Sequence, residues 1–217
     1  MVDMEILAAQ LRQPTGELGL KVAQNMNESN GAISREAARL LNLSSTSNLL
    51  EVGMGNGGFA AEWLAANPNL HYTGADFSET MVEEATRLNA EHIAAGRARF
   101  VLADAAALPF ADGEFDRILT ANTLYFYSDP SAVLAEYYRV LAPGGRLVLA
   151  IRSEDTMKHM PFTQHGFTMY SRPALEALFK ASPFGECEVH SFFEEFRKSV
   201  AGTVEPTTSY LAVAIRS

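Results

Sequence analysis

Residues Leu49 to Gly58, LLEVGMGNGG, combine a short apolar run with a loop that holds four glycines. The apolar run predicts a buried β-strand, and the glycines predict a tight turn between that strand and a helix. Glycine lacks a Cβ atom, so backbone N–H groups in such a turn can approach a ligand closely. The stretch therefore predicts a strand, loop and helix whose loop contacts a bound molecule.

The spacing of the loop residues fits two templates. Gly53, Gly55 and Gly58 fit G-x-G-x-x-G, which is typical of dinucleotide-binding loops. Glu51 followed by Gly53, Gly55 and Gly57 fits an acidic-x-G-x-G-x-G pattern instead. A carboxylate at Glu51 would repel a pyrophosphate and attract a cationic group, so the second template is favoured. A glycine-rich turn without a ligand is less favoured, because four glycines and a strand-end acid would then only lower stability.

The composition is that of a single globular domain. With 217 residues and 47% hydrophobic side chains, the chain can bury one sizeable core. Seventeen basic against 26 acidic residues give a formal charge of -9 without any run of Lys or Arg, which argues against a nucleic-acid partner. The single cysteine, Cys187, cannot form an internal disulfide or a cysteine-based metal cluster.

The N-terminus and the distribution of apolar residues predict a cytoplasmic protein. Residues 1–5 lack the basic start and the apolar stretch of a signal peptide. No apolar run approaches the length that spans a membrane, so we expect no membrane span. His159 and His165 lie six positions apart without a third convincing ligand, and we therefore expect no metal site.

Helical and strand patterns alternate along most of the chain. Strands are expected at residues 49–52, 70–75, 99–103, 115–121 and 146–151, and helices at 58–66, 78–96, 130–142 and 173–181. This alternation predicts an α/β fold with a doubly wound, mostly parallel sheet. Near the C-terminus, residues 185–196 and 209–215 both have strand patterns and are joined by a link that contains Gly and Pro, which predicts an antiparallel hairpin.

Two segments stand outside this alternation. Apolar residues have helical spacing at 4–12, 18–26 and 33–41, with a break expected at 27–31, so residues 1–46 are expected to form a helical cap on a core of residues 47–217. Core packing and closure over a ligand explain such a cap equally well. Residues 152–172 form a long irregular stretch rich in large apolar side chains, which predicts a functional lid segment.

Three of the expected strands end in an acidic residue: Glu51, Asp76 and Asp104. In an open parallel sheet, ligands bind at the carboxyl ends of the strands near the point where the strand order reverses. The three carboxylates could therefore each satisfy a different part of one ligand. Asp76 could instead only cap the helix that follows, but Ser78 is already a good N-cap. Asp104 could be a solvated loop acid.

From about Leu49 to Ser217 the chain resembles the class I, Rossmann-like methyltransferases that use S-adenosylmethionine. Within them it is similar to the small-molecule branch that includes ubiquinone and menaquinone biosynthesis enzymes. The resemblance is carried by the acidic glycine motif, the strand-end acids, the turn at residues 143–145 and the terminal hairpin. It implies a seven-stranded sheet that ends in an antiparallel hairpin.

The resemblance also implies roles for individual residues around the cofactor S-adenosyl-L-methionine. The loop glycines would lie against the cofactor, and Asp76 would bind both of its ribose hydroxyls. The next side chain, Phe77, would lie beside the adenine or only pack as a hydrophobic staple. The methionyl end would meet Glu51 and the residues just past the fourth strand. The expected cofactor site is Glu51, Gly53, Gly55, Gly57, Asp76, Phe77, Asp104, Ala105, Ala121 and Asn122.

The expected reaction is transfer of a methyl group to a small organic acceptor by in-line displacement. Such a reaction needs positioning and exclusion of water more than it needs a base. If the acceptor is a hydroxyl, His165 is the first candidate to take its proton, followed by Tyr125 and Tyr127. A simple lid residue is the favoured interpretation of His165, and the tyrosines could be core aromatics, although aromatics in such a loop more often line a pocket.

Two departures from the wider family narrow the substrate, and two rival functions stay open. Asn122 is followed by Thr-Leu-Tyr, so the Asn-Pro-Pro-Tyr type motif of nucleic-acid amino-methylating enzymes is missing, and the chain has no catalytic Pro-Cys. An NAD(P)-dependent oxidoreductase would use the same glycines but gives Glu51 no role. A catalytically silent subunit that binds S-adenosylmethionine is the second rival. The sequence predicts no particular oligomeric state.

Overall fold

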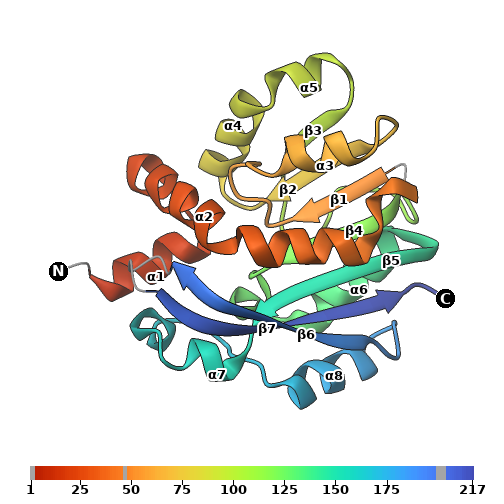
Figure 1. Cartoon of the computed structure of the whole chain (residues 1–217). Helices are drawn as coiled ribbons and strands as arrows, with labels where there is room; N and C mark the ends of the chain where they lie inside the picture. The colour runs from red at the N-terminus through yellow and green to blue at the C-terminus, as the bar shows by residue number, and fades with distance from the viewer. Residues whose placement is uncertain (1–2, 46–47, 199–203) are drawn as a thin grey trace.

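The computed structural model describes residues 3–45, 48–198 and 204–217, which form a seven-stranded sheet flanked by helices (Figure 1). The strands are β1 (Asn48–Val52), β2 (His71–Asp76), β3 (Ala98–Leu102), β4 (Phe115–Ala121), β5 (Leu141–Arg152), β6 (Glu188–Lys198) and β7 (Val204–Ile215). The α-helices are α1 (Met4–Arg12), α2 (Gly16–Leu41), α3 (Ala60–Ala66), α4 (Glu79–Leu88), α5 (Ala90–Ala94), α6 (Pro130–Val140), α7 (Glu154–Met157) and α8 (Arg172–Lys180). Short 3-10 helices are η1 (Leu43–Ser45), η2 (Leu124–Phe126) and η3 (Pro161–Gln164).

The strands follow the order β3-β2-β1-β4-β5-β7-β6. β7 runs antiparallel to both of its neighbours, whereas the other paired strands are parallel. The predicted α/β fold, with a mostly parallel sheet and a C-terminal antiparallel hairpin, is therefore confirmed. From β1 the chain passes to β2 and β3 on one side and then continues at β4 on the other side. The strand order thus reverses between β1 and β4, where ligands bind in sheets of this kind.

Each face of the sheet is covered by its own set of helices. Leu49 and Leu50 are both fully buried, but they belong to separate apolar clusters because successive strand residues point to opposite faces. The cluster of Leu49 includes Trp63 of α3 and residues of α2. The cluster of Leu50 includes Tyr137 of α6 and Phe179 of α8. Coverage on both faces explains why the central strands carry consecutive buried apolar residues, such as Leu49-Leu50 in β1 and Ile118-Leu119 in β4.

The N-terminal cap contains one long helix where two were expected. α2 continues from Gly16 to Leu41 without the break predicted at 27–31. Tertiary contacts override the weak helix propensity of this stretch, because Asn27 bonds to Asn56 of the glycine loop at 2.9 Å and Ser29 is buried. Neither α2 nor any other helix of the described ranges is long and apolar enough to cross a bilayer. The boundary drawn between residues 46 and 47 lies outside the described residues.

Two further expected elements differ in extent. The helix expected at 78–96 is divided into α4 and α5 at Asn89, whose buried side chain donates to the carbonyls of Gly57 and Ala85 at 3.2 and 2.9 Å. The hairpin strands extend well into the predicted link, and Pro206 lies within β7. The strand register shifts at this point, and such irregularities are where a sheet tolerates proline. Residues 199–203 of the link lie outside the described residues.

The predicted lid segment, residues 152–172, is more regular than expected. It begins with the last residue of β5, contains α7 and η3, and ends at the start of α8. Ser153 caps α7 by accepting a hydrogen bond from the backbone N–H of Thr156 at 3.2 Å. Its large apolar side chains are directed into the protein, because Met157, Met160 and Phe162 are all buried.

Because α2 is continuous, we expect two glycine substitutions within it to change the free energy of unfolding in opposite directions. A Cβ at Gly31 would meet only the flexible end of Arg35, at 3.0 Å, whereas a Cβ at Gly19 would lie 2.6 Å from the backbone of Pro14. We expect Gly31→Ala to raise the free energy of unfolding by ~0.5–1 kcal/mol, because alanine favours a helix interior over glycine. Gly19→Ala should lower it. Urea unfolding of both variants tests this, and a destabilised Gly31→Ala protein would contradict a continuous α2.

Candidate functional site

A cavity of about 420 Å³ lies at the carboxyl ends of the parallel strands. Its lining comes from the residues that follow β1, β2, β3 and β4, together with residues of the N-terminal cap. It contains every residue of the predicted cofactor set except Gly57, namely Glu51, Gly53, Gly55, Asp76, Phe77, Asp104, Ala105, Ala121 and Asn122. The fold therefore brings these residues together in one site, although they are spread over more than seventy positions in the sequence.

Each of the three loop positions is glycine for a different structural reason. Gly53 has a φ of 72° and lies so close to β4 that a Cβ would be 2.2 Å from the Thr123 side chain. Gly55 has a φ of 57°, yet a Cβ there would meet no atom within 4 Å. Gly57 packs against α4, because a Cβ would be 2.9 Å from that of Ala85. Gly55 is thus the loop glycine that borders the cavity with open space beside it.

Asp76 connects the end of β2 to the glycine loop. Its Oδ2 accepts a hydrogen bond from the N–H of Gly55 at 3.0 Å, and its Oδ1 accepts one from the N–H of Ser78 at 2.9 Å. Burial raises the pKa of Asp76 to about 6, although the hydrogen bonds from backbone N–H groups oppose the shift. A carboxylate can accept about four hydrogen bonds. Asp76 therefore retains the capacity to accept a further hydrogen bond from a molecule in the cavity.

Glu51 is buried at the end of β1 and also lines the cavity. Its Oε2 accepts hydrogen bonds from the Trp63 indole and the Tyr72 hydroxyl, both at 2.9 Å. Burial raises the pKa of Glu51 to about 7, and these two hydrogen bonds act in the opposite direction. Its Oε1 has no hydrogen bond to any residue that the structure describes. A cationic group in the cavity could pair with this oxygen and favour the charged form.

The remaining residues of the predicted set form the ends of the cavity. Phe77 is 41% exposed, and Asp104 is exposed with its carboxylate accepting from the N–H of Ala106 at 2.9 Å. Asn122 follows β4 in a left-handed conformation with a φ of 58°. Its Oδ1 accepts a hydrogen bond from the Tyr125 hydroxyl at 3.1 Å. These contacts hold polar and aromatic groups around the cavity.

The three predicted catalytic side chains are not brought together. Tyr127 lines the large cavity, and its hydroxyl lies 2.8 Å from that of Tyr137. Burial raises the pKa of Tyr127, so the phenol keeps its proton at neutral pH. The Tyr125 hydroxyl is engaged by the backbone of Arg152. His165 is exposed and lines neither this cavity nor the one described next. A catalytic role for any of the three stays a prediction.

A second, smaller cavity of about 70 Å³ adjoins the first. The two share five lining residues: Leu11, Met26, Asn30, Asn122 and Phe126. The rest of its lining comes from α2, η2, the end of β5 and the lid segment, namely Ser29, Tyr125, Arg152, Met157, Phe162 and Phe167. Helical spacing alone did not single out the cap residues, because a cavity-lining face and a core-packing face have the same apolar pattern.

The cap is tied to the sheet beside the large cavity. The Ser78 hydroxyl donates to the carbonyl of Pro14 at 2.5 Å, and Gln13 donates to the carbonyl of Phe77 at 3.3 Å. Leu11, Arg12 and Pro14 all line this cavity. The cap therefore forms part of the cavity wall. Within the described ranges, no three His, Cys, Asp or Glu side chains are grouped as a metal ion would require.

The chain is similar in sequence to known methyltransferases. A family model described as "Methyltransferase domain" matches residues 50–149. A ubiquinone/menaquinone biosynthesis C-methyltransferase (UbiE) of Desulfotalea psychrophila is 36% identical over 135 residues, which are 61% of this chain and 52% of that protein. An O-methyltransferase (cnsE) of Penicillium expansum is 30% identical over 173 residues, which are 77% of this chain and 62% of that protein. The chain thus spans between about half and three fifths of these relatives.

Among solved structures, the fold is similar to that of a geranyl diphosphate C-methyltransferase from Streptomyces coelicolor. That structure is a complex with Mg²⁺, geranyl diphosphate and S-adenosyl-L-homocysteine. The TM-score is 0.68 at 16% sequence identity, and the match covers 96% of this chain and 87% of the other.

The raised pKa of Glu51 makes the stability of the ligand-free protein depend on pH. Its pKa is about 7 in the folded state and near the ordinary value of 4.5 when unfolded, so the folded state binds this proton more tightly. The free energy of unfolding should therefore fall as the pH rises from about 4.5 to 7, by on the order of 1–3 kcal/mol.

Glu51→Gln isolates this effect, because glutamine still accepts from Trp63 and Tyr72 but does not titrate. The pKa of Asp76 is raised to about 6, so this residue also lowers the free energy of unfolding as the pH rises, but at lower pH than Glu51. Asp76→Asn should remove this contribution. Urea unfolding at pH 5, 6, 7 and 8 measures the difference. A Glu51→Gln protein with the wild-type slope between pH 6 and 7 would contradict this assignment.

Proposed function

We propose that the chain is a class I, Rossmann-like methyltransferase that binds S-adenosyl-L-methionine in the large cavity and transfers its methyl group to a small organic acceptor. The observation that carries the proposal is the arrangement of Glu51, Gly55 and Asp76 around one cavity at the point where the strand order reverses. The matched relatives are longer proteins, so the activity is inferred for this chain from its own residues.

The residues of the cavity fit an adenosyl amino acid. Gly55 borders open space, so the ligand can lie against the loop backbone where a side chain would stand. The Asp76 carboxylate retains acceptor capacity at the cavity, which suits the hydroxyls of a ribose. The unpaired Oε1 of Glu51 suits the ammonium of the methionyl group. We assign the adenine end to Phe77, Asp104 and Ala105.

The chain's part in the reaction is to hold two molecules in line and to exclude water. The bound cofactor supplies a methyl group on a positively charged sulfur. Ala121 is the last residue of β4 and Asn122 follows it. We assign the methionyl end to these two residues, and Asn122 also borders the second cavity. Leu11 and Met26 of the cap line both cavities and would cover the reacting groups. Positioning of this kind supplies a large share of the rate in reactions without covalent chemistry on the enzyme.

The oxidoreductase alternative lacks support from the loop. Its template uses Gly58, but a Cβ at Gly58 would be 2.4 Å from the Asn27 side chain, and Gly58 does not line the cavity. The position is glycine because α2 packs there. A dinucleotide also gives the buried Glu51 carboxylate no cationic partner. A measurement of turnover distinguishes a catalytically silent subunit from an active enzyme.

A pair of valine substitutions tests whether the loop is the cofactor cradle. Gly55→Val should abolish binding of S-adenosylmethionine, because the side chain would occupy the space beside the loop. Gly166→Val is the matched control: Gly166 also has a positive φ, of 80°, and open space around it, but it lines neither cavity. Each variant should lose ~1–2 kcal/mol of stability through backbone strain. Calorimetric titration then separates them, and equal affinities would show that the loop is not the cradle.

The methyl-transfer activity itself is tested without a known acceptor. The protein is incubated with S-adenosylmethionine that carries a labelled methyl group and with an extract of small metabolites, and the labelled product is identified by mass spectrometry. We expect label in one small organic product and none when Gly55→Val protein is used. Cofactor binding without any labelled product would support the silent subunit, and tight NADH binding without S-adenosylmethionine binding would support the oxidoreductase.

A further inference from the structure

The second cavity has an aromatic wall. Phe167 lies in the lid segment with its ring centroid 4.7 Å from Phe126, 5.5 Å from Phe162 and 5.9 Å from Tyr125. The contact with Phe126 is edge-to-face, at 64°. All four rings line the cavity. Rings that are grouped at these distances favour a further ring packed against them, by edge-to-face or offset contacts.

The cavity also has a polar edge, where hydrogen-bond donors lack partners. Asn30 makes no side-chain hydrogen bond to any described residue, and Asn122 uses its Oδ1 but not its Nδ2. The Nε–H of Arg152 is buried and has no hydrogen-bond partner among the residues that the structure describes. A buried donor without a partner costs free energy unless a ligand or water satisfies it. All three residues line the second cavity, so their donors are available to a ligand oxygen bound there.

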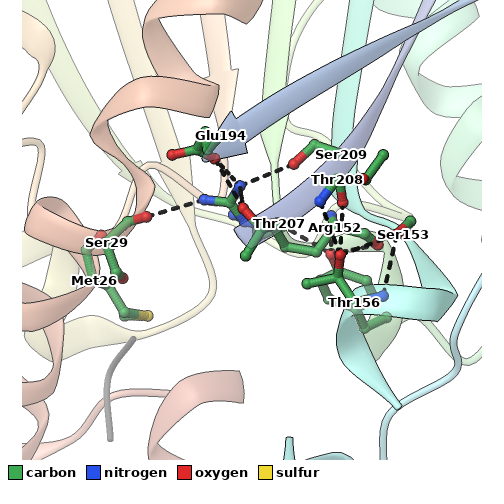
Figure 2. A network of polar contacts seen from close by, with 11 residues as sticks. Met26, Ser29, Arg152, Ser153, Thr156, Glu194, Thr207, Thr208 and Ser209 are labelled. Atoms are coloured by element: carbon green, nitrogen blue, oxygen red, sulfur yellow. Dashed lines mark hydrogen bonds and ion pairs between the residues drawn. The ribbon is translucent and has the colours of Figure 1, made fainter. Parts of the chain in front are cut away.

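Arg152 is held rigidly at this edge (Figure 2). Its guanidinium donates to Glu194 of β6, to Thr207 and Ser209 of β7, and to the carbonyl of Ser29 in α2 at 3.0 Å. Figure 2 shows that these partners approach from the cap on one side and from the hairpin on the other. The network joins the cap, the sheet and the hairpin, and the polar edge of the cavity is therefore fixed before any ligand arrives.

We propose that the second cavity is the methyl-acceptor pocket and that it takes an aromatic ring bearing a hydrogen-bond-accepting oxygen, with the ring against Phe126 and Phe167 and the oxygen at Asn30, Asn122 and Arg152. The inference rests on the proposed function, because the five residues shared with the large cavity put an acceptor here next to the cofactor. An aliphatic acceptor would not use the aromatic wall, and a hydrocarbon ring would leave the donors unpaired.

Three probes of equal size test this chemistry: phenol, toluene and cyclohexanol. Each is titrated by ligand-observed NMR, to about 10 mM, against protein saturated with S-adenosylhomocysteine, which leaves only the acceptor side open. We expect phenol to bind at least about threefold more tightly than either of the other two, which is the scale of one net hydrogen bond. Equal affinities, or no binding of any probe, would overturn the inference.

Variants then locate the bound ring. Asn30→Ala removes one donor from a helix where alanine is well tolerated, and it should reduce the preference for phenol over toluene. Phe167→Ala should weaken both aromatic probes at least about threefold. Phe193→Ala is the control, because Phe193 is 64% exposed on β6 and lines neither cavity. A phenol preference that survives both pocket variants would place the probe elsewhere and overturn the inference.

The outcomes also separate this inference from the proposed function. If S-adenosylhomocysteine binds and no probe does, the cofactor site stands and the assignment of the acceptor pocket fails. If S-adenosylhomocysteine does not bind, the proposed function fails. The probes are then titrated against the free protein. A phenol preference sensitive to Asn30→Ala would support the ring site alone, and its absence would overturn that site as well.

Discussion

The hydrogen bond from the Gly55 N–H to the Asp76 carboxylate joins the glycine loop to the end of β2, and the large cavity is built around it. A second bond, from the Gly53 N–H to the carbonyl of Ala75 at 2.8 Å, holds the start of the loop against the same strand. Both need positive φ angles in the loop, which only glycine adopts readily. The other Asp76 oxygen bonds to the N–H of Ser78, just before α4. One carboxylate thus fixes loop, strand and helix start.

Arg152 is a second anchor of the cap: it forms a buried ion pair with Glu194 and donates to the carbonyl of Ser29 in α2. Burying two charges is costly, and it is tolerated only where hydrogen bonds satisfy the remaining donors and acceptors. Here Thr207, Ser209 and the carbonyl of Ser29 supply most of them. The arrangement leaves the Nε–H of Arg152 without a partner among the described residues, next to a small cavity. A ligand oxygen bound in this cavity could accept a hydrogen bond from the Nε–H and would thereby be stabilised.

The sequence predicted the features that local chemistry determines. The glycine loop, the strand-end acids Glu51 and Asp76, and the terminal hairpin were expected from spacing and alternation, and the structure gathers these two acids in one cavity. The continuity of α2 was missed because it depends on the contact with Asn56, which is remote in sequence. The hydrogen-bond network of Arg152 could not be predicted, because no sequence pattern near Arg152 indicates a partner as distant as Glu194. The exposure of His165 depends on how α7 and η3 fold, which spacing does not reveal.

A crystal structure of the protein with S-adenosylhomocysteine would show whether the large cavity is the cofactor site. We expect the ligand to lie in the large cavity with both ribose hydroxyls on the Asp76 carboxylate, the amino group at Oε1 of Glu51 and the loop backbone at Gly55 against it. The sulfur should point toward Asn122 and the second cavity. A ligand bound outside the large cavity, or one inside it whose ribose makes no hydrogen bond to Asp76, would show that the assignment of this site is wrong.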